Sequence, residues 1–500
     1  MRKIINPQLQ FGEQDIANIH LDPKSRDDIP QILRGLQHIY TTPKLREAVF
    51  TILEEVIPER VAEEAGGKAD PNTGRPGMEQ WKILVLGVLR QGLNADYDRI
   101  HELSNQHNTI RQMLGHSDWA DETTYELQTP KDNLRLFTPE ILDRINREVV
   151  GAGQVLVKKS PVEGLNARCD SFVVETNVHF PTDTNLLYDA IRKAIEACAE
   201  LSQANGLSEW RQSAYNIRQF KKLYRVIQQL RHSTSKDEDK REAKRIEIEE
   251  AYRIYLEQAE VYLERARNTR LRLEIDCSVP SVCLESLDEY MAHAVRQIEQ
   301  ICRRVLQGEK IPHSEKVFSI FQPHTEWIVK GKAGVPMELG LRVCVVEDRH
   351  GFILNHQVME KTTDDRIAVA IVQETKARFP ELSSVSFDKG FHSRQNQAEL
   401  ANILDLVILP KKGKRSVSDT VREHDPEFIR LRHCHSAVES AINALEVHGL
   451  NKCPDHGIDG FKRYVALAVV ARNIQKLGAV LRRQEQEQEE RKRGPYKKAA

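Results

Sequence analysis

The strongest constraint on the fold is an alternation of short apolar, β-branched segments with helical patterns over residues 311–480. Segments of strand length are separated by longer ones whose apolar residues recur at helical spacing. The expected strands are 327–329, 339–346, 352–358, 385–388 and 406–409, and the expected helices are 364–379, 393–402, 437–447 and 461–477. This order predicts an α/β domain in which a mixed sheet is covered by helices.

One more strand is expected far upstream, at 167–178, where apolar and β-branched residues surround Asp170. The residues that follow, 184–310, have helical patterns and are strongly charged, so they are predicted to be an insertion after the first strand. Two apolar stripes, 217–230 and 252–263, flank the polar segment 233–240, and the simplest prediction is two long antiparallel helices. We expect such a pair to have too little core to stand alone.

The N-terminal region is also helical in pattern, with one helix beginning at Thr42-Pro43 and others near Trp81 and Ile100. A small bundle of this kind is either a packing or dimerisation module or a domain that recognises DNA ends, and periodicity does not choose between them. The predicted organisation is a helical N-terminal domain over 1–160, the first core strand within 161–183, a helical insertion over 184–310, the rest of the core over 311–480 and a charged, frayed tail over 481–500.

The bulk properties exclude several classes of protein. A chain of 500 residues is too long for one hydrophobic core. No apolar run is long enough to span a membrane and the N-terminus lacks a signal-peptide stretch, so a cytoplasmic protein is predicted. The eight cysteines include no CxxC pair, which argues against a zinc ribbon. The net charge is −1, so any DNA contact must come from local basic clusters.

Three carboxylates are the candidate catalytic residues: Asp170, Asp388 and Glu439. In a sheet of this order the first and fourth strands lie side by side at the centre, so Asp170 and Asp388 can meet. A helix packed across the same end can add Glu439. Because the chain has 74 acidic residues, three of them could also be unrelated surface charges. A charge inside an apolar strand is costly unless it is paired or metal-bound, which favours a site.

Three such acids suit phosphodiester chemistry. Mg²⁺ is a hard cation that prefers carboxylate oxygens to His or Cys. Two ions about 3.5–4 Å apart can activate an attacking oxygen and stabilise a leaving one. Asp170 would bridge both ions, and Asp388 and Glu439 would each hold one.

These residues also carry a family resemblance. Two segments resemble the second-aspartate region of DDE-type insertion-sequence transposases, namely Asp388-Lys389-Gly390-Phe391-His392-Ser393 and Leu409-Pro410-Lys411-Lys412-Gly413. Three segments resemble the glutamate region of that family: Ala437-Val438-Glu439, His448-Gly449-Leu450 and Ala471-Arg472-Asn473-Ile474. The first-aspartate strand is resembled by Arg168-Cys169-Asp170-Ser171-Phe172. The N-terminal domain is resembled by Gly74-Arg75-Pro76 and the helices after it. The pattern, with its long insertion, is most similar to the ISNCY group and covers about residues 40–480. The extended Tyr-Arg-Glu-Lys signature of related enzymes is absent, since Arg432, His435 and Glu446 occupy its other positions.

The resemblance implies an RNase H-like catalytic core and a transposase that cleaves DNA and transfers strands at the ends of an insertion sequence. It assigns the metal-binding triad to Asp170, Asp388 and Glu439, with two Mg²⁺ ions that Mn²⁺ can replace. The implied partners are double-stranded DNA, as terminal inverted repeats and target, and a second copy of the chain in the DNA complex. The implied location is a bacterial or archaeal cytoplasm, at the nucleoid. Two alternatives remain open: a catalytically inactive DNA-binding protein derived from a transposase, and a helical scaffold.

Basic residues near the expected site are candidates for contacts with DNA phosphates. The best cluster follows the strand 406–409, where the metals are expected. The candidate residues are Lys330, Lys332, Lys389, Lys411, Lys412, Lys414 and Arg415. The segment His433-Cys434-His435 has no second ligand pair nearby, so a zinc site is not favoured. His435 lies one helical turn before Glu439 and could reach the scissile phosphate or the attacking water, but a surface histidine is the favoured interpretation.

Overall fold

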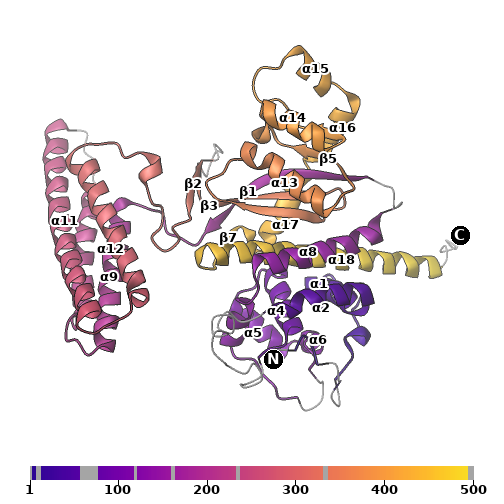
Figure 1. Cartoon of the computed structure of the whole chain (residues 1–500), viewed down its shortest axis with the longest axis horizontal. Coiled ribbons are helices and arrows are strands. Elements are labelled where there is room, and N and C mark those ends of the chain that lie inside the picture. Colours follow the sequence, from indigo (N-terminus) through magenta and orange to yellow (C-terminus); the bar gives the residue numbers. More distant parts are fainter. Residues whose placement is uncertain are drawn as a thin grey trace. The chain divides into compact units, whose positions relative to one another are not determined.

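The computed structural model describes residues 3–6, 9, 13–56, 77–116, 121–158, 164–231, 237–329 and 336–493. The chain divides into two compact units (Figure 1). Unit 1 comprises Met1–Asn177 and Ile328–Ala500, and unit 2 comprises Val178–Trp327. The predicted class is confirmed at the level of a mixed α/β protein with a mixed sheet and many helices. The segment around Gly74-Arg75-Pro76 lies outside the described residues.

In the described part of the chain, the sheet has seven strands. They are β1 (Leu165–Thr176), β2 (Glu326–Val329), β3 (Met337–Asp348), β4 (Ile353–Met359), β5 (Leu382–Phe387), β6 (Leu406–Ile408) and β7 (Lys452–Cys453). Their order is β2-β3-β1-β5-β6, with β4 also paired to β3 and β7 to β1. The pairs β1/β3 and β3/β4 are antiparallel, whereas β1/β5 and β5/β6 are parallel. The prediction that the strand carrying Asp170 lies beside the strand that ends at Asp388 is confirmed by the pairing of β1 with β5.

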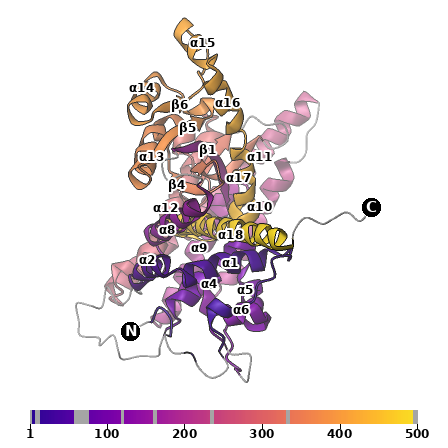
Figure 2. The same ribbon diagram turned by 90° about the vertical axis from the view of Figure 1, so that its right-hand side faces the viewer.

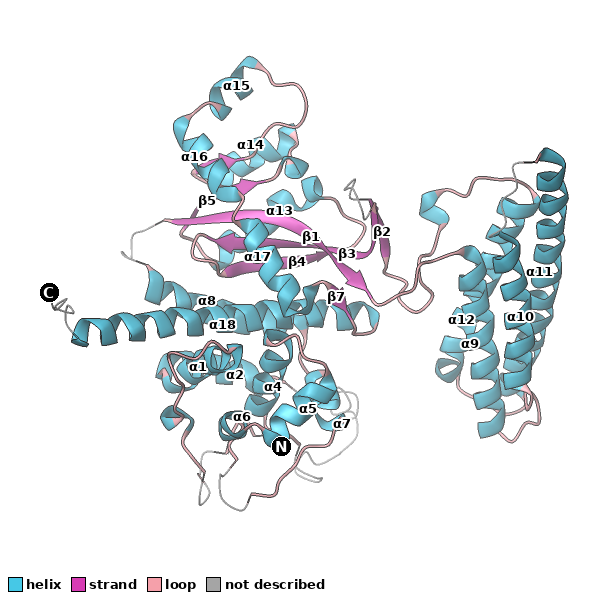
Figure 3. Cartoon of the chain, turned by 180° about the vertical axis from the view of Figure 1, so that it is seen from behind, coloured by secondary structure: helices cyan, strands magenta, loops and turns pink. Residues whose placement is uncertain are grey.

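Both faces of the sheet are covered by helices, and β1 alternates its side chains between them. Ala167 and Cys169 belong to the core that includes α13 (Asp364–Arg378). Phe172 and Val174 belong to the core under α17 (Val438–Leu445) and α18 (Gly457–Arg493). Figures 2 and 3 show α13 and α17 on opposite faces. Asp170 has the same parity as Phe172, so it lies on the α17 face.

The N-terminal helices share one hydrophobic core with the sheet. These helices are α1 (Asp28–Thr41), α2 (Pro43–Glu54), α4 (Gln80–Gly92), α5 (Tyr97–Gln106), α6 (Asn108–Met113), α7 (Gln128–Leu134) and α8 (Pro139–Val157). The long helix α18 packs against α1, α4 and α8. At Gly35 of α1 and Gly478 of α18 the two backbones approach so closely that a Cβ on either glycine would clash with the other helix. Among the described residues, α18 is the one helix long and apolar enough to cross a membrane, and 72% of its apolar window is buried, as in a core helix.

The expectation of a frayed tail after Arg482 is wrong for the residues up to Arg493, which continue α18. The reason is a set of polar contacts with the N-terminal segment. Arg482 donates to the carbonyl of Ser25 at 3.1 Å, and Gln486 donates to that of Pro23 at 2.7 Å. A composition dense in charge does not show such partners, because they lie more than 400 positions away in the chain.

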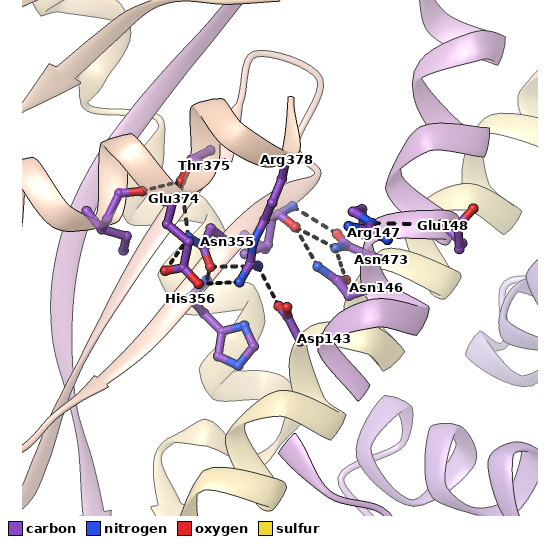
Figure 4. A network of polar contacts seen from close by, with 12 residues as sticks. Asp143, Asn146, Arg147, Glu148, Asn355, His356, Glu374, Thr375, Arg378 and Asn473 are labelled. Carbon is purple, nitrogen blue, oxygen red and sulfur yellow. Dashed lines mark hydrogen bonds and ion pairs between the residues drawn. The ribbon is translucent and has the colours of Figure 1, made fainter. Parts of the chain in front are cut away.

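A buried polar network fixes the edge of the sheet to the helices (Figure 4). The Asn473 side chain of α18 accepts from the Ile353 N–H at 2.9 Å and donates to the Ile353 carbonyl at 2.8 Å, so it completes the hydrogen bonding of β4. It also donates to the amide oxygen of Asn146 on α8 at 2.7 Å. On the same strand, Asn355 accepts from Arg378 of α13 at 3.0 Å, and Arg378 forms an ion pair with Asp143 of α8 at 2.6 Å. Helices α8, α13 and α18 are thereby joined through one strand.

Unit 2 is a helical bundle with a core of its own. Its long helices are α9 (Asp183–Ala204), α10 (Ser213–Arg231), α11 (Glu238–Ile275) and α12 (Ser281–Ile301), and α12 continues into the π-helical turn Cys302–Leu306. Phe220 stacks on Tyr255 with ring centroids 4.6 Å apart. The prediction of two helices is wrong by two. It found α10 and α11 but missed the turns at Gly206 and Ser278, both of which have positive φ. Two helices would have too little core to stand alone, but the four helices together enclose a hydrophobic core.

Candidate active site

Asp170 lies in the middle of the central strand, where two neighbouring elements bring in further acids. The register of β1 and β5 pairs Cys169 with Phe387, so Asp170 continues beside Asp388, the first residue after β5. Glu439 lies in the first turn of α17, which contacts β1 (Figure 3). Asp170 is partly buried, whereas Asp388 and Glu439 are exposed.

The pKa of Asp170 is raised, partly because other carboxylates lie close to it. Burial, together with repulsion from Asp388, Asp364 and Glu439, raises the pKa of Asp170 to about 6. The Ser171 N–H donates to Asp170 Oδ1 at 2.8 Å and opposes the shift. The three predicted carboxylates therefore act on one another through space. Such a raised pKa is common where acids gather at functional sites.

Asp364 is a fourth acid that the sequence interpretation missed. It is the first residue of α13, and its Oδ1 accepts from the Ser171 hydroxyl at 2.6 Å. A Cβ built on Gly390, just after Asp388, would lie 3.3 Å from Asp364 Oδ2. Asp364 is thus held between β1 and the turn after β5. The one signal in the sequence was that Asp364 follows Thr363 as an acid in the first turn of a predicted helix. Such a pattern is ordinarily interpreted as the start of a helix and not as a site.

His435 faces the acids, so its interpretation as a surface histidine is wrong. It ends α16 (Pro426–His435), is half-buried, and its Nδ1 lies 3.0 Å from the hydroxyl of Ser386 on β5. Burial lowers the pKa of His435, and Asp388 and Glu439 act in the opposite direction. Its neighbours His433 and Cys434 are exposed. The histidine is therefore anchored to the strand that ends at Asp388.

Arg168, two residues before Asp170 on the same face of β1, has an acidic partner on the neighbouring strand. Its guanidinium lies 3.5 Å from Glu347 on β3. Burial raises the pKa of Glu347 to about 7, and Arg168 opposes that shift. This pair balances charge beside the site without neutralising Asp170.

The basic candidates fall into three groups. Lys330 and Lys332 lie outside the described residues. Lys411 and Arg415 have acidic partners: Lys411 Nζ is 3.8 Å from Asp419, and Arg415 Nε is 3.0 Å from the buried Glu423.

Lys389, Lys412 and Lys414 are exposed. Lys389 directly follows Asp388, and the other two lie in the loop between β6 and α15 (Val417–Glu423). The loop therefore offers fewer free cations than its sequence suggests, because two of the four belong to ion pairs.

The donor set fits a hard divalent cation in its chemistry, since Asp170, Asp364, Asp388 and Glu439 supply carboxylate oxygens alone. As the side chains stand, no group of three or more His, Cys, Asp or Glu residues within the described ranges is gathered closely enough to hold a metal ion.

Comparisons of the chain with protein-family models, with curated proteins and with solved structures found no match. The assignment of function therefore depends on the residues of the site and their surroundings.

Proposed function

We propose that this chain is a DDE-type insertion-sequence transposase, which cleaves DNA and transfers strands at the ends of its element. The observation that carries the proposal is the placement of Asp170 on the central strand beside Asp388, with Glu439 in the first turn of α17, which contacts the same strand. The raised pKa of Asp170 agrees with this grouping of acids. A partly buried acid kept among other acids is destabilising unless a cation or a reaction requires it. Two of these acids are the ones that the family resemblance assigns together with Asp170.

The strand order supports an RNase H-like core. The central strand β1 has antiparallel β3 on one side and parallel β5 on the other. The antiparallel series continues to β4 and the parallel series to β6. This arrangement sets Asp170 and Asp388 at neighbouring positions, as the resemblance requires.

Asp170, Asp388 and Glu439 are the proposed ligands of two Mg²⁺ ions. Bound ions would supply activation of the attacking oxygen and stabilisation of the leaving one. The chain itself positions the acids on rigid elements: β1 for Asp170, the end of β5 for Asp388 and α17 for Glu439. Asp364, fixed by the Ser171 hydroxyl, adds negative charge beside Asp170. Lys389, Lys412 and Lys414 are the proposed phosphate contacts of this unit.

A cleavage assay with the full-length protein tests the proposal. The substrate is a plasmid carrying the DNA that flanks the coding region, incubated with Mg²⁺ or Mn²⁺. We expect cleavage at the flanking ends, and we expect Asp170→Asn, Asp388→Asn and Glu439→Gln each to reduce it by several orders of magnitude while duplex binding persists. Glu427→Gln, an exposed acid on α16, is the matched control and should leave cleavage unchanged.

The second candidate is a DNA-binding protein without catalysis. It is favoured by the spacing of the acids, which form no metal-binding group among the described residues. The same assay separates the two functions. Binding of the flanking DNA without cleavage in either metal would support the second candidate, and unchanged cleavage by the Asp170→Asn variant would remove the proposed site.

A further inference from the structure

Helix α10 of unit 2 carries five basic residues and no acidic one. All five are exposed: Arg218, Lys221, Lys222, Arg225 and Arg231. The first four have the spacing i, i+3, i+4, i+7, which places them along one face of the helix. We call these four residues the α10 stripe.

The opposite side of α10 is fixed in the core of the bundle, so the stripe cannot turn inward. Phe220 and Ile227 are buried, and Ile217 and Tyr224 pack against the same core. The Phe220 ring stacks on Tyr255 of α11. At the margin of the stripe, Lys221 Nζ lies 6.0 Å from the centre of the Tyr188 ring on α9. The cations are thus held outward by the packing of their own helix.

The charges of the α10 stripe lack the local compensation that the next helix has. On α11, Lys244 pairs with Glu247 at 3.1 Å and Arg245 pairs with Glu242 at 2.6 Å. Within the described ranges, no residue of the stripe makes an ion pair. Like charges three or four residues apart destabilise a helix. A partner with regularly spaced negative charges would reverse the sign of that interaction.

We infer that the α10 stripe binds the phosphate backbone of double-stranded DNA. The eight residues from Arg218 to Arg225 span about 10 Å of helix. One strand of a duplex advances about 3.4 Å per phosphate, so this length faces about three phosphates. Contacts of this kind position a duplex and carry no sequence information. The inference rests on the proposed function, which makes duplex DNA the substrate, and it adds a contact surface on unit 2 to the acids of unit 1.

Fluorescence anisotropy of labelled duplexes, measured with the full-length protein over a range of salt concentrations, tests the inference. The test variant changes Arg218, Lys221, Lys222 and Arg225 to glutamine, a good helix former. The control variant makes the same change in charge on α11, at Lys240, Arg241, Lys244 and Arg245. Each phosphate contact contributes about 0.9 to the slope of log affinity against log salt, so loss of about three contacts should lower the slope of the test variant by about 2.7.

The loss should be equal for the flanking DNA and for a duplex of unrelated sequence, and the control should keep the wild-type slope. Circular dichroism melting checks that both variants are folded. An unchanged slope in the test variant overturns the inference, and so does an equal loss in the control. The inference is also overturned if the test variant alone loses binding to phosphatidylserine vesicles while its binding to duplex DNA is unchanged.

The plasmid cleavage assay separates this inference from the proposed function. If duplex binding depends on the α10 stripe but the wild type does not cleave the plasmid, the proposed transposase function is refuted and the inference about the stripe stands. Cleavage by a protein whose duplex binding ignores the stripe refutes the inference alone.

Discussion

Replacing Asp170 with asparagine should stabilise the metal-free protein at neutral pH, although most substitutions destabilise. In the folded chain the pKa of Asp170 is raised from the ordinary 3.8 to about 6. Below pH 3.8 the carboxyl is protonated in both the folded and the unfolded chain. As the pH rises through 6, the unfolded chain has already lost the proton and the folded chain must lose it against burial and repulsion, so folding stability falls.

The size of the effect follows from the shift. A difference of 2.2 units, from 3.8 to 6, corresponds to roughly 3 kcal/mol at 1.36 kcal/mol per unit. Asp170 is partly exposed, so solvent screening reduces this to about 1–2 kcal/mol. Asparagine keeps the acceptor for the Ser171 N–H and removes the charge. The variant should therefore gain stability at pH 7.5 and none at pH 3.5.

Calorimetry of the full-length protein with a chelator, at the two pH values, measures this difference. Addition of 10 mM Mg²⁺ should then stabilise the wild type by about 1.4 kcal/mol if the dissociation constant is on the order of 1 mM, and should stabilise the variant less. The exposed Asp405→Asn is the control for loss of one negative charge. A gain of equal size at both pH values, or none at pH 7.5, would refute the electrostatic reasoning.

Two further predictions concern the core and the basic loop. Asn473→Leu leaves the buried N–H of Ile353 without its partner, at about 1–3 kcal/mol, whereas the Ile353 carbonyl keeps the Asn146 amide at 3.1 Å. Hydrogen exchange of the β4 amides should therefore accelerate markedly, and unchanged exchange would contradict the role of the network. Changing both Lys412 and Lys414 to glutamine should lower the salt slope of duplex binding by about 1.8, whereas Lys411→Gln should change it little because its ammonium already pairs with Asp419 of α15. Equal effects of the double and the single change would contradict this division of the loop.

The strands of the core were predictable because short runs of β-branched apolar residues favour strands over helices. Residues 167–178 and 339–346 are found in β1 and β3 with boundaries shifted by a few positions. The adjacency of β1 and β5 was predictable too, since it follows from strand order. The proximity of Asp388 to Asp170 then required no further information.

What the sequence could not supply are contacts between distant segments. Asp364 joins the acids through a hydroxyl on another strand, and His435 turns toward them because Ser386 binds its Nδ1. Neither bond has a local pattern. The helices of unit 2 were undercounted for a local reason instead, because their turns depend on isolated residues of positive φ, Gly206, Trp210 and Ser278, within strongly helical surroundings.

The near-zero net charge of the chain conceals a separation of charge that matters for a DNA enzyme. Acids gather around Asp170 on unit 1, and unpaired cations gather in the α10 stripe on unit 2. Many other charges cancel locally, as in the pair Arg415–Glu423. Exposed charges farther apart than about 8 Å are largely screened at physiological salt, so a phosphate responds to its nearest patch and not to the sum. A net charge of −1 is therefore compatible with strong attraction of phosphate at the α10 stripe and repulsion of phosphate at the acids. Only a cation held among those acids would turn that repulsion into attraction.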